Sequence, residues 1–496
     1  MRYWTCETLR ELVIYAMVIF SPWAFGTTQG WSIWAMNVTA YVLALLSVLS
    51  WTIRKLARYE ALEWGTPELP DRQGMTLWRQ PKVANVALGT ITVALLTYCL
   101  TSALNARATF RPAESRFEYH VCVAWLPHSY DSTSTWFAFW TYLGLVCVFW
   151  STCDWLSAKS GAEIGSQGFP RRLRRLLWLL SLNGGLLAAE CIIQRLADSP
   201  KLLFLVKPHI HQTAITQFGP YAYRANAAQY LNLLWPLCLG LWFTFNSSQR
   251  PKHRHAHLLL VCSALMSAGA IISASRGGAL ISGFMLLTCA LLVLTRGHFR
   301  LEIRTQMDSS SIAVEGKPFP PFAQMSRAPI LTTCLLAVPI LALAFGWHEI
   351  KSRMPENGDS MKARLHIYDV VSHMIQDFGV FGAGPGSYQT VSELYHPAEA
   401  EFWPAQAHND WLETRLTFGL PGCTLFLLAL GLVILRWFIP GGLPARAIFV
   451  CLSWLALLGC LIHSAFDFPF QIHSIAFLFV VECAILFTLS RRPWLA

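Results

Sequence analysis

The chain has 496 residues, of which 54% are hydrophobic and only 13% are charged. In a soluble domain about a quarter of the residues are charged. This composition therefore excludes an ordinary soluble enzyme and indicates an integral membrane protein. The net charge of +10 does not indicate nucleic-acid binding, because most basic residues fall in loops between apolar segments. The 14 cysteines lie mostly inside those segments as small hydrophobic side chains, so neither a disulfide framework nor a zinc site is expected.

Apolar segments of about 20 residues, the length that a spanning helix needs, recur along the whole chain. We predict an all-α transmembrane bundle of about twelve spans, which forms a single membrane domain over residues 1–496. The first segment has no A-x-A cleavage site, so we expect it to be retained. The predicted spans are 11–27, 31–51, 83–103, 135–153, 175–195, 227–245, 258–274, 279–295, 329–347, 419–438, 447–465 and 472–490.

Basic residues gather in the loops after spans 2, 4, 6 and 8 and in the C-terminal tail. The positive-inside rule places these segments, and therefore both termini, in the cytoplasm. The stretch 296–328, rich in Ser, Pro and Gly toward its end, is then predicted to be a cytoplasmic linker. The long loop 348–418, between spans 9 and 10, is predicted to be partly helical and to face the outside.

A short polar break, Ser275-Arg276-Gly277-Gly278, separates two apolar runs at the predicted outer surface. One explanation is a turn whose arginine reaches the lipid phosphates. We favour a functional role, because polar groups at a bilayer are costly and paired glycines leave the backbone bare. An anionic group could then approach closely while Arg276 binds it in a bidentate manner.

The loop 348–418 contains a predicted amphipathic helix that starts near Arg364 and a glycine-rich segment, 382–387. The predicted apolar face of the helix consists of Leu365, Tyr368, Val371 or Ser372, and Ile375. The pattern alone does not decide whether Arg364 is functional or an ordinary surface charge. We interpret the segment 382–387 as a tight turn, since no Gly-Lys-Ser/Thr follows it as in a phosphate-binding loop.

His408-Asn409-Asp410 follows in the same loop, with Glu413 three residues further on. Histidine titrates near neutral pH, so His408 suits a general base that Asn409 and Asp410 could orient. A metal site at His408, Asp410 and Glu413 matches no tight ligand motif. A helix N-cap at Asn409 or Asp410 is also expected, and it is compatible with a catalytic His408.

Two further outer turns carry polar residues. His463 and Asp467 lie one helical turn apart between the last two spans, where they either satisfy each other or contact a ligand. Arg224 and Asn226 precede span 6, where they line the same outer cleft or meet lipid headgroups. The residues themselves leave both choices open.

In this order, the motifs resemble the O-antigen ligase and O-antigen polymerase superfamily of bacterial inner membranes. The resemblance covers residues 215–490 and rests on four stretches: Ser275 to Gly278, Arg364 followed by Gly382 to Gly386, His408 to Glu413 followed by Phe418-Gly419, and His463 to Phe468. It implies a multi-pass inner-membrane glycosyltransferase without metal or other cofactor. Such proteins often have an acidic residue before F-G-L, and this chain has Thr417 at that position. No residue of this chain is therefore assigned the role of that acidic residue.

The resemblance also implies a chemistry. The enzyme would take a glycan from undecaprenyl diphosphate and join it, with inversion, to an acceptor hydroxyl on a lipid A-core or another glycan at the outer face. Carried over, Arg276 and Arg364 bind the diphosphate and His408 is the base. Fixed guanidinium groups suit this role, because a departing diphosphate builds up negative charge. The predicted substrate-binding residues are Arg224, Asn226, Asn409, Asp410, His463 and Asp467.

Other functions remain open. A polymerase of the same superfamily would differ from a ligase only in its acceptor. A transporter for a lipid-linked glycan would use the arginines without a base, and it would tolerate loss of His408. A metallohydrolase would use His408, Asp410, Glu413, His463 and Asp467 as ligands. The sequence does not decide whether the loop 104–133 gates substrate entry.

Overall fold

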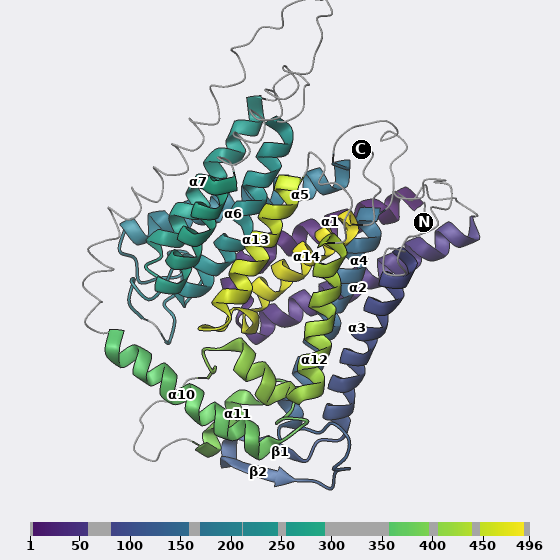
Figure 1. Cartoon of the computed structure of the whole chain (residues 1–496), viewed down its shortest axis with the longest axis vertical. Helices are drawn as coiled ribbons and strands as arrows, with labels where there is room; N and C mark the ends of the chain where they lie inside the picture. Colours follow the sequence, from purple (N-terminus) through teal and green to yellow (C-terminus); the bar gives the residue numbers. More distant parts are fainter. Residues whose placement is uncertain are drawn as a thin grey trace, which may run out of the picture.

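The computed structural model describes residues 3–57, 81–157, 169–210, 212–246, 254–292, 357–395, 405–438 and 447–490. These residues form a bundle of packed helices with a smaller lobe at one end (Figure 1). The predicted span 329–347 and the predicted linker 296–328 lie outside the described residues, as do parts of the loop 348–418.

The bundle and the lobe are built from helices of very different lengths. The α-helices are α1 (Tyr3–Trp23), α2 (Gly30–Leu56), α3 (Pro81–Leu104), α4 (Ser132–Ser157), α5 (Arg171–Leu196), α6 (Arg224–Asn246), α7 (His257–Ile272), Arg276–Leu292, α10 (Asn357–Phe378), α11 (Tyr388–Ser392), α12 (Asp410–Phe438), α13 (Ala447–His463) and α14 (His473–Leu489). Single 3-10 turns lie at Phe25–Thr27, Pro112–Glu114, Arg254–Ala256, Glu393–Tyr395 and Pro469–Gln471.

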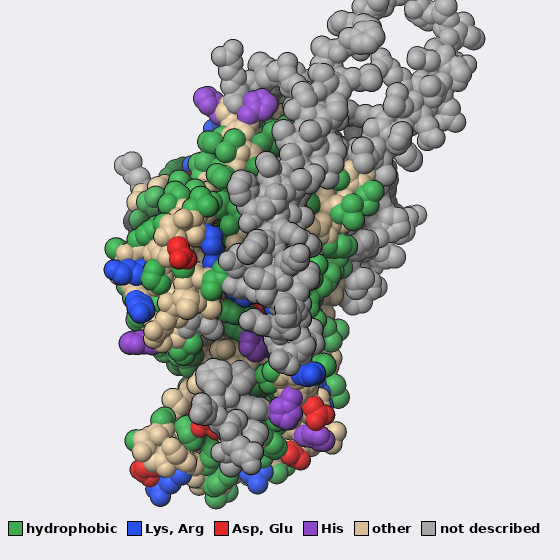
Figure 2. All heavy atoms as spheres, turned by 90° about the vertical axis from the view of Figure 1, so that its left-hand side faces the viewer, with side chains coloured by type: hydrophobic (Ala, Val, Ile, Leu, Met, Phe, Trp, Pro, Cys, Tyr) green, Lys and Arg blue, Asp and Glu red, His purple; other side chains and the backbone are tan. Residues whose placement is uncertain are grey.

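Several of these helices suit a membrane. Within the described ranges, five are long and apolar enough to cross one, namely α2, α3, α4, α5 and the part Asp410–Ile434 of α12. Four shorter helices, α7, Arg276–Leu292, α13 and α14, are also apolar. Wide hydrophobic areas cover the described surface in Figure 2, as expected where helices meet lipid. A helical membrane protein is therefore confirmed, while the total of twelve spans stays a prediction.

α6 lies in the middle of the bundle and packs against α5, α7, α13 and α14. Leu231, Trp235 and Leu239 in this helix are completely buried. Helices in lipid are held together by close packing and buried polar contacts rather than by exclusion of water. A central helix that is buried on all sides can therefore carry polar side chains between its neighbours.

The lobe has its own small hydrophobic core between α10, α11 and the first turns of α12. Ile367, Val371 and Met374 of α10 are buried in it, whereas Leu365 is exposed. The predicted apolar face of this helix was therefore wrong in part. Apolar residues of α11, of α12 and of the segments beside them cover the side of α10 that carries residues 367, 371 and 374, and Leu365 is exposed.

The glycine-rich segment 382–386 is a tight turn, as predicted. Its three glycines have φ values of 74°, 107° and 76°, which side chains rarely adopt. Ala383 N donates to Leu416 O at 2.8 Å, and Gly384 N donates to Thr417 O at 3.0 Å. These two donors hold the turn against α12, so they are not available to a phosphate group.

α12 begins at Asp410, well before the predicted span 419–438. Asn409 caps it, because Asn409 Oδ1 accepts hydrogen bonds at 3.1 Å from the backbone N–H groups of Trp411 and Leu412. The cap predicted for this stretch is therefore confirmed. Helical geometry breaks inside α12 at Gly419, where φ is 60° and ψ is −166°.

A β-hairpin corrects the all-α prediction. Strands β1 (Ala108–Arg111) and β2 (Arg116–Tyr119) pair antiparallel between α3 and α4. Phe110 lies opposite Phe117 on one face, and Thr109 lies opposite Glu118 on the other. This alternation of apolar and polar side chains is typical of a strand, and it occurs outside the apolar runs on which the prediction depended.

Candidate active site

Residues 463–468, in the turn between α13 and α14, form the centre of the candidate site. Asp467 is buried there, and each of its carboxylate oxygens faces a histidine. His408 Nδ1 lies 3.4 Å from Asp467 Oδ1, and His463 Nε2 lies 3.7 Å from Asp467 Oδ2. The side chain of His408 is 22% exposed, whereas that of His463 is buried. Two separate sequence motifs therefore meet at one carboxylate, and His408 is the accessible histidine.

The backbone of His408 is held in an uncommon conformation, with φ at 50°. Tyr368 OH, on α10, donates a hydrogen bond of 2.8 Å to His408 O. The imidazole packs edge-on against Phe468, with 4.9 Å between ring centroids. Left-handed conformations at residues other than glycine carry strain and cluster at functional sites. The surrounding contacts hold His408 in this position in spite of that strain.

Two arginines approach the same turn from different helices. Arg364, on α10, donates from Nη1 to Phe466 O at 3.0 Å. Arg276 is exposed and opens the helix Arg276–Leu292. Its neighbour Gly277 packs so tightly on the turn that an added Cβ would lie 2.6 Å from Phe466 and 2.9 Å from His463 Nε2. The structure thus brings Arg364 and His408 to a single turn, and the helix that Arg276 opens packs on that turn through Gly277.

The glycines beside Arg276 have a different role from the one predicted. The space that a side chain at Gly277 would occupy is filled by His463 and Phe466, and at Gly278 it is filled by Ala228 of α6. The prediction that these glycines admit an anionic group was therefore wrong. They allow the helix Arg276–Leu292 to pack closely on α6 and on the turn.

A stripe of buried polar side chains on α6 was missed by the sequence reasoning. Gln229 Oε1 lies 2.7 Å from His463 Nδ1, and Asn232 Nδ2 donates to Gly278 O at 3.0 Å. Both side chains are completely buried. Asn226, Gln229 and Asn232 follow at intervals of three residues within an apolar run, and that spacing is the signal that could have identified them. α6 therefore connects the two motifs through hydrogen bonds.

The polar residues that follow His408 hold the backbone. Asp410 is buried, its Oδ2 accepts a hydrogen bond from Phe470 N at 2.9 Å, and its Oδ1 accepts one from Gln471 Nε2 at 3.1 Å. Glu413 Oε2 accepts from Ala407 N at 2.8 Å. Asp410 thus ties the start of α12 to the turn after α13, and Glu413 fixes the residue before His408.

The segment before α6 reaches the site through a residue that was not singled out. Tyr223 OH donates to Asp467 Oδ2 at 3.4 Å, and its ring stacks on Phe468 with 5.4 Å between centroids. Arg224 donates from Nη1 to Ile215 O at 2.9 Å, and Asn226 is buried in the first turn of α6. The substrate-binding roles predicted for Arg224 and Asn226 stay predictions.

The electrostatics of the site favour an ionised Asp467. Burial alone would raise the pKa of Asp467, but the contact with His408 and the nearby His463 and Arg364 hold that pKa below its ordinary value. The pKa of the Tyr223 hydroxyl is raised, mainly by burial and then by the Asp467 charge. The site therefore combines a carboxylate, a neutral phenol and the guanidinium group of Arg364 around an accessible imidazole.

The set of ligands considered for a metallohydrolase is not assembled. Within the ranges that the structure describes, no group of three or more His, Cys, Asp or Glu side chains is arranged to hold a metal ion. The carboxylates of Asp410 and Glu413 are instead directed at protein N–H groups. The arrangement suits acid–base and electrostatic chemistry carried out by side chains.

A comparison with known protein families adds a finding on the middle of the chain. Residues 261–427 match the family described as O-Antigen ligase. The matched stretch contains Arg276, Arg364 and His408, and the resemblance seen in the sequence is confirmed. It supports a glycosyltransferase of the ligase or polymerase type in a bacterial inner membrane. No curated protein matches the chain.

Proposed function

We propose that the chain is a ligase-like glycosyltransferase that moves a glycan from undecaprenyl diphosphate to an acceptor hydroxyl at the outer face of the inner membrane. The observation that carries the proposal is the meeting of Arg364, His408 and Asp467 at the turn 463–468, beside the helix that Arg276 opens. The match to the O-antigen ligase family supplies the reaction class. The geometry supports a role for each of these residues in it.

His408 acts as the general base. With Nδ1 protonated toward Asp467, Nε2 carries the free lone pair and accepts the proton of the acceptor hydroxyl. The acceptor oxygen then attacks the anomeric carbon while the bond from that carbon to the diphosphate oxygen breaks. Attack opposite the leaving group inverts the anomeric configuration. Asp467 orients the imidazole and stabilises its positive charge after proton transfer.

Arg276 and Arg364 bind the diphosphate and stabilise the charge that develops on it as it leaves. A guanidinium group stays charged and matches phosphate oxygens with two parallel donors. Such preorganised donors act on the transition state without reorganising at the moment of reaction. The reaction needs no further energy source, because the glycan arrives already activated by the diphosphate.

The acceptor distinguishes a ligase from a polymerase. Transfer to a lipid A-core glycan gives a product with one added chain, whereas transfer to another lipid-linked repeat gives a growing series. We favour the ligase, and the size distribution of the product separates the two activities.

The test is transfer in vitro by the purified full chain from undecaprenyl-diphosphate glycan, with EDTA present. Wild type is expected to transfer, while His408→Ala and Arg276→Ala lose activity by about 100-fold or more, as expected for a general base and a charge-stabilising donor. Two surface variants serve as matched controls and should keep full activity: His373→Ala, which removes an exposed histidine of α10, and Arg116→Ala, which removes an exposed arginine of the hairpin. Full activity of His408→Ala would favour transport, and loss of transfer with EDTA would overturn the metal-free reaction.

A further inference from the structure

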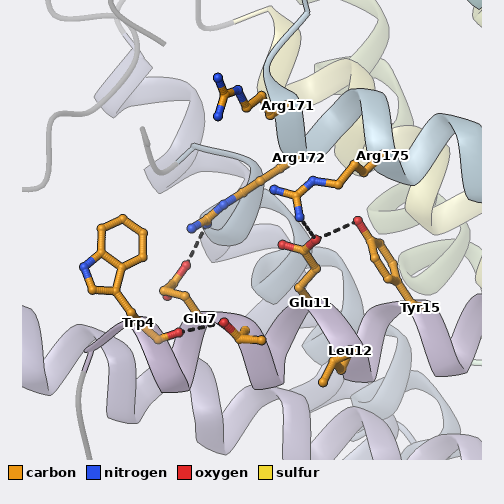
Figure 3. Close-up of a pocket in the computed structure, with 9 residues that line it drawn as sticks. Trp4, Glu7, Glu11, Leu12, Tyr15, Arg171, Arg172 and Arg175 are labelled. Atoms are coloured by element: carbon orange, nitrogen blue, oxygen red, sulfur yellow. Dashed lines mark hydrogen bonds and ion pairs between the residues drawn. The ribbon is translucent and has the colours of Figure 1, made fainter. Parts of the chain in front are cut away.

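A second polar cluster lies at the other end of the bundle from His408, where α1 and α5 begin and α2 and α4 end. It surrounds a cavity of about 350 Å³ between α1 and α5 (Figure 3). The cavity is lined by Trp4, Glu7, Thr8, Glu11, Leu12, Tyr15, Arg171, Arg172 and Arg175. Three arginines from the first turns of α5 thus face one side of α1.

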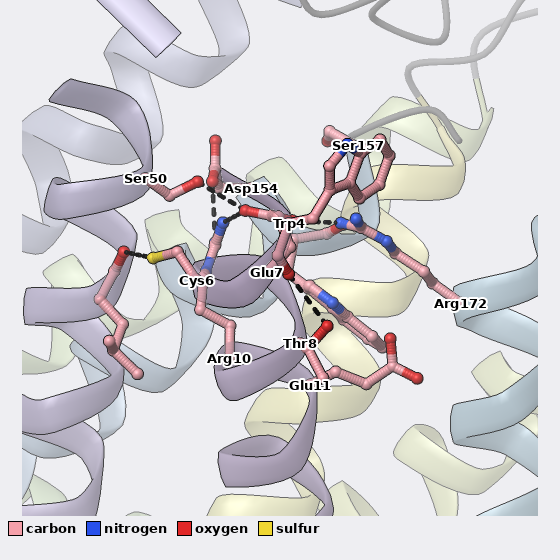
Figure 4. Close-up of polar contacts among 12 residues, drawn as sticks. Trp4, Cys6, Glu7, Thr8, Arg10, Glu11, Ser50, Asp154, Ser157 and Arg172 are labelled. Carbon is pink, nitrogen blue, oxygen red and sulfur yellow. Dashed lines mark hydrogen bonds and ion pairs between the residues drawn. The ribbon is translucent and has the colours of Figure 1, made fainter. Parts of the chain in front are cut away.

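Ion pairs connect the walls of this cavity with the ends of α2 and α4 (Figure 4). Arg10 is completely buried and lies 2.8 Å from both Glu7 and Asp154. The remaining pairs are Arg54–Asp154 at 3.0 Å, Arg172–Glu7 at 2.6 Å and Arg175–Glu11 at 2.6 Å. Among the residues of this network that the structure describes, four guanidinium groups face three carboxylates, which is an excess of one positive charge.

A cluster in which cations outnumber anions attracts an anion to the same place. Arg175 uses Nη1 for Glu11, and its side chain is 58% exposed. A guanidinium has five N–H donors in a planar fork, so Arg175 keeps donors for a ligand at the cavity. Phosphate is the anion that such forks bind best.

The rim of the cavity is apolar. Trp4 and Leu12 line it and are 52% and 56% exposed, on a helix that packs in the bundle. An exposed tryptophan and leucine beside arginines are typical of the level at which phospholipid headgroups meet acyl chains. Basic pockets between membrane helices bind anionic lipid headgroups on this principle.

We propose that this cavity binds a phosphate group, supplied by an anionic phospholipid of the leaflet at this end of the bundle. The phosphate lies against Arg171 and Arg175, and an acyl chain lies along Leu12. This end is the predicted cytoplasmic one, so the site is separate from the transfer reaction at His408. A bound phosphate also compensates the excess charge of the network that joins α1, α2, α4 and α5.

The test measures thermal unfolding of the purified full chain in neutral detergent against three probes: phosphatidylglycerol, phosphatidylcholine and inorganic phosphate. Phosphatidylglycerol is expected to raise the Tm of wild type, and phosphatidylcholine at the same concentration is not. The double variant Arg171→Gln/Arg175→Gln should bind phosphatidylglycerol roughly thirtyfold more weakly, since each arginine near a membrane surface contributes about a factor of five. For each variant, the change in Tm is measured relative to the Tm of the same variant without lipid or phosphate. A variant that is less stable than wild type can therefore still be compared.

Arg174→Gln is the matched control, because Arg174 is exposed in the same turn of α5 and does not line the cavity. It should respond to phosphatidylglycerol like wild type, and Arg171→Lys/Arg175→Lys should keep most of the response. If inorganic phosphate stabilises wild type as strongly as the lipid, the site is a phosphate site whose ligand is free phosphate. An equal response to both lipids, or an undiminished response of the glutamine double variant, would overturn the proposal.

Discussion

Asp467 is the residue at which the contacts of the candidate active site meet, because both histidines face its carboxylate. Asp467→Asn keeps the size of the side chain but removes the charge that orients and stabilises the His408 imidazolium. If Asp467 positions the base as proposed, kcat for glycan transfer should fall by about 100-fold or more, with a smaller change in the KM of the donor. A variant that changes only KM would show that Asp467 binds substrate rather than positioning the base.

The lowered pKa of Asp467 also predicts a pH dependence of stability. A carboxyl whose folded pKa lies below its unfolded value of about 4 stabilises the fold above that value. This contribution is lost as pH falls through the folded pKa. The Tm of wild type should therefore exceed that of Asp467→Asn near pH 6, and the difference should shrink on going to about pH 3. A difference that stays constant over this range would contradict the lowered pKa.

Some residues of the candidate site could be predicted from the sequence, and others could not. Arg276 and His408 stand out because polar residues between apolar runs are costly, whereas the role of Arg364 was implied only by the family resemblance. Gln229 was missed because its spacing from Asn226 and Asn232 was not used, and its contact with His463 depends on the packing of α6 against α13. Gly277 was misinterpreted because a glycine can allow either a ligand or a neighbouring helix to approach the backbone, and the sequence does not distinguish these two cases.

At the scale of elements, the break inside α12 positions the active-site end of that helix relative to its span. Gly419 has φ 60° and ψ −166°, which only glycine adopts readily, and an added Cβ would collide with the backbone of residues 380 and 381. Gly419→Ala should destabilise the fold by about 3 kcal/mol or more through strain and this collision. The measurement is thermal unfolding in detergent.

Gly431 provides the matched control within the same helix. Nothing lies within 4 Å of a Cβ added there, and its backbone is helical. Gly431→Ala should leave the Tm unchanged or raise it slightly, because alanine favours a helix by about 1 kcal/mol over glycine. If both variants unfold at the same temperature, Gly419 is not required for the break in α12.

The helices that were predicted well are those that form from a single long run of apolar residues. Long apolar runs give helices, and every predicted span except 329–347, which lies outside the described residues, falls on a helix. The start of α12 was predicted by its cap at Asn409, whereas its continuity with the span 419–438 was not, because residues 410–418 mix polar and apolar side chains. The hairpin 108–119 was missed because its strands are only four residues long.

At the scale of the whole molecule, polar clusters occupy the two ends of an apolar bundle. Glu7 joins α1, α2 and α5, since it pairs with Arg10 and Arg172 and accepts a hydrogen bond of 2.5 Å from Ser50. Removing one partner of a buried ion-pair network leaves uncompensated charge, which costs more than the loss of an exposed pair. The stability of the bundle should therefore depend strongly on this one carboxylate.

Glu7→Gln tests this dependence. It leaves Arg10 and Arg172 buried with one anion fewer, so we expect the free energy of unfolding to fall by about 3 kcal/mol, read as a lower Tm of the full chain in detergent. Glu114→Gln is the control, because Glu114 pairs with Arg116 on the exposed hairpin and its loss should leave the Tm unchanged. Below its own Tm, Glu7→Gln should still transfer glycan at the wild-type rate, since Glu7 lies at the other end of the bundle from His408. A normal Tm for Glu7→Gln would show that solvent or lipid compensates Arg10 and Arg172. A lost transfer rate in folded protein would instead show that the two ends of the bundle are coupled.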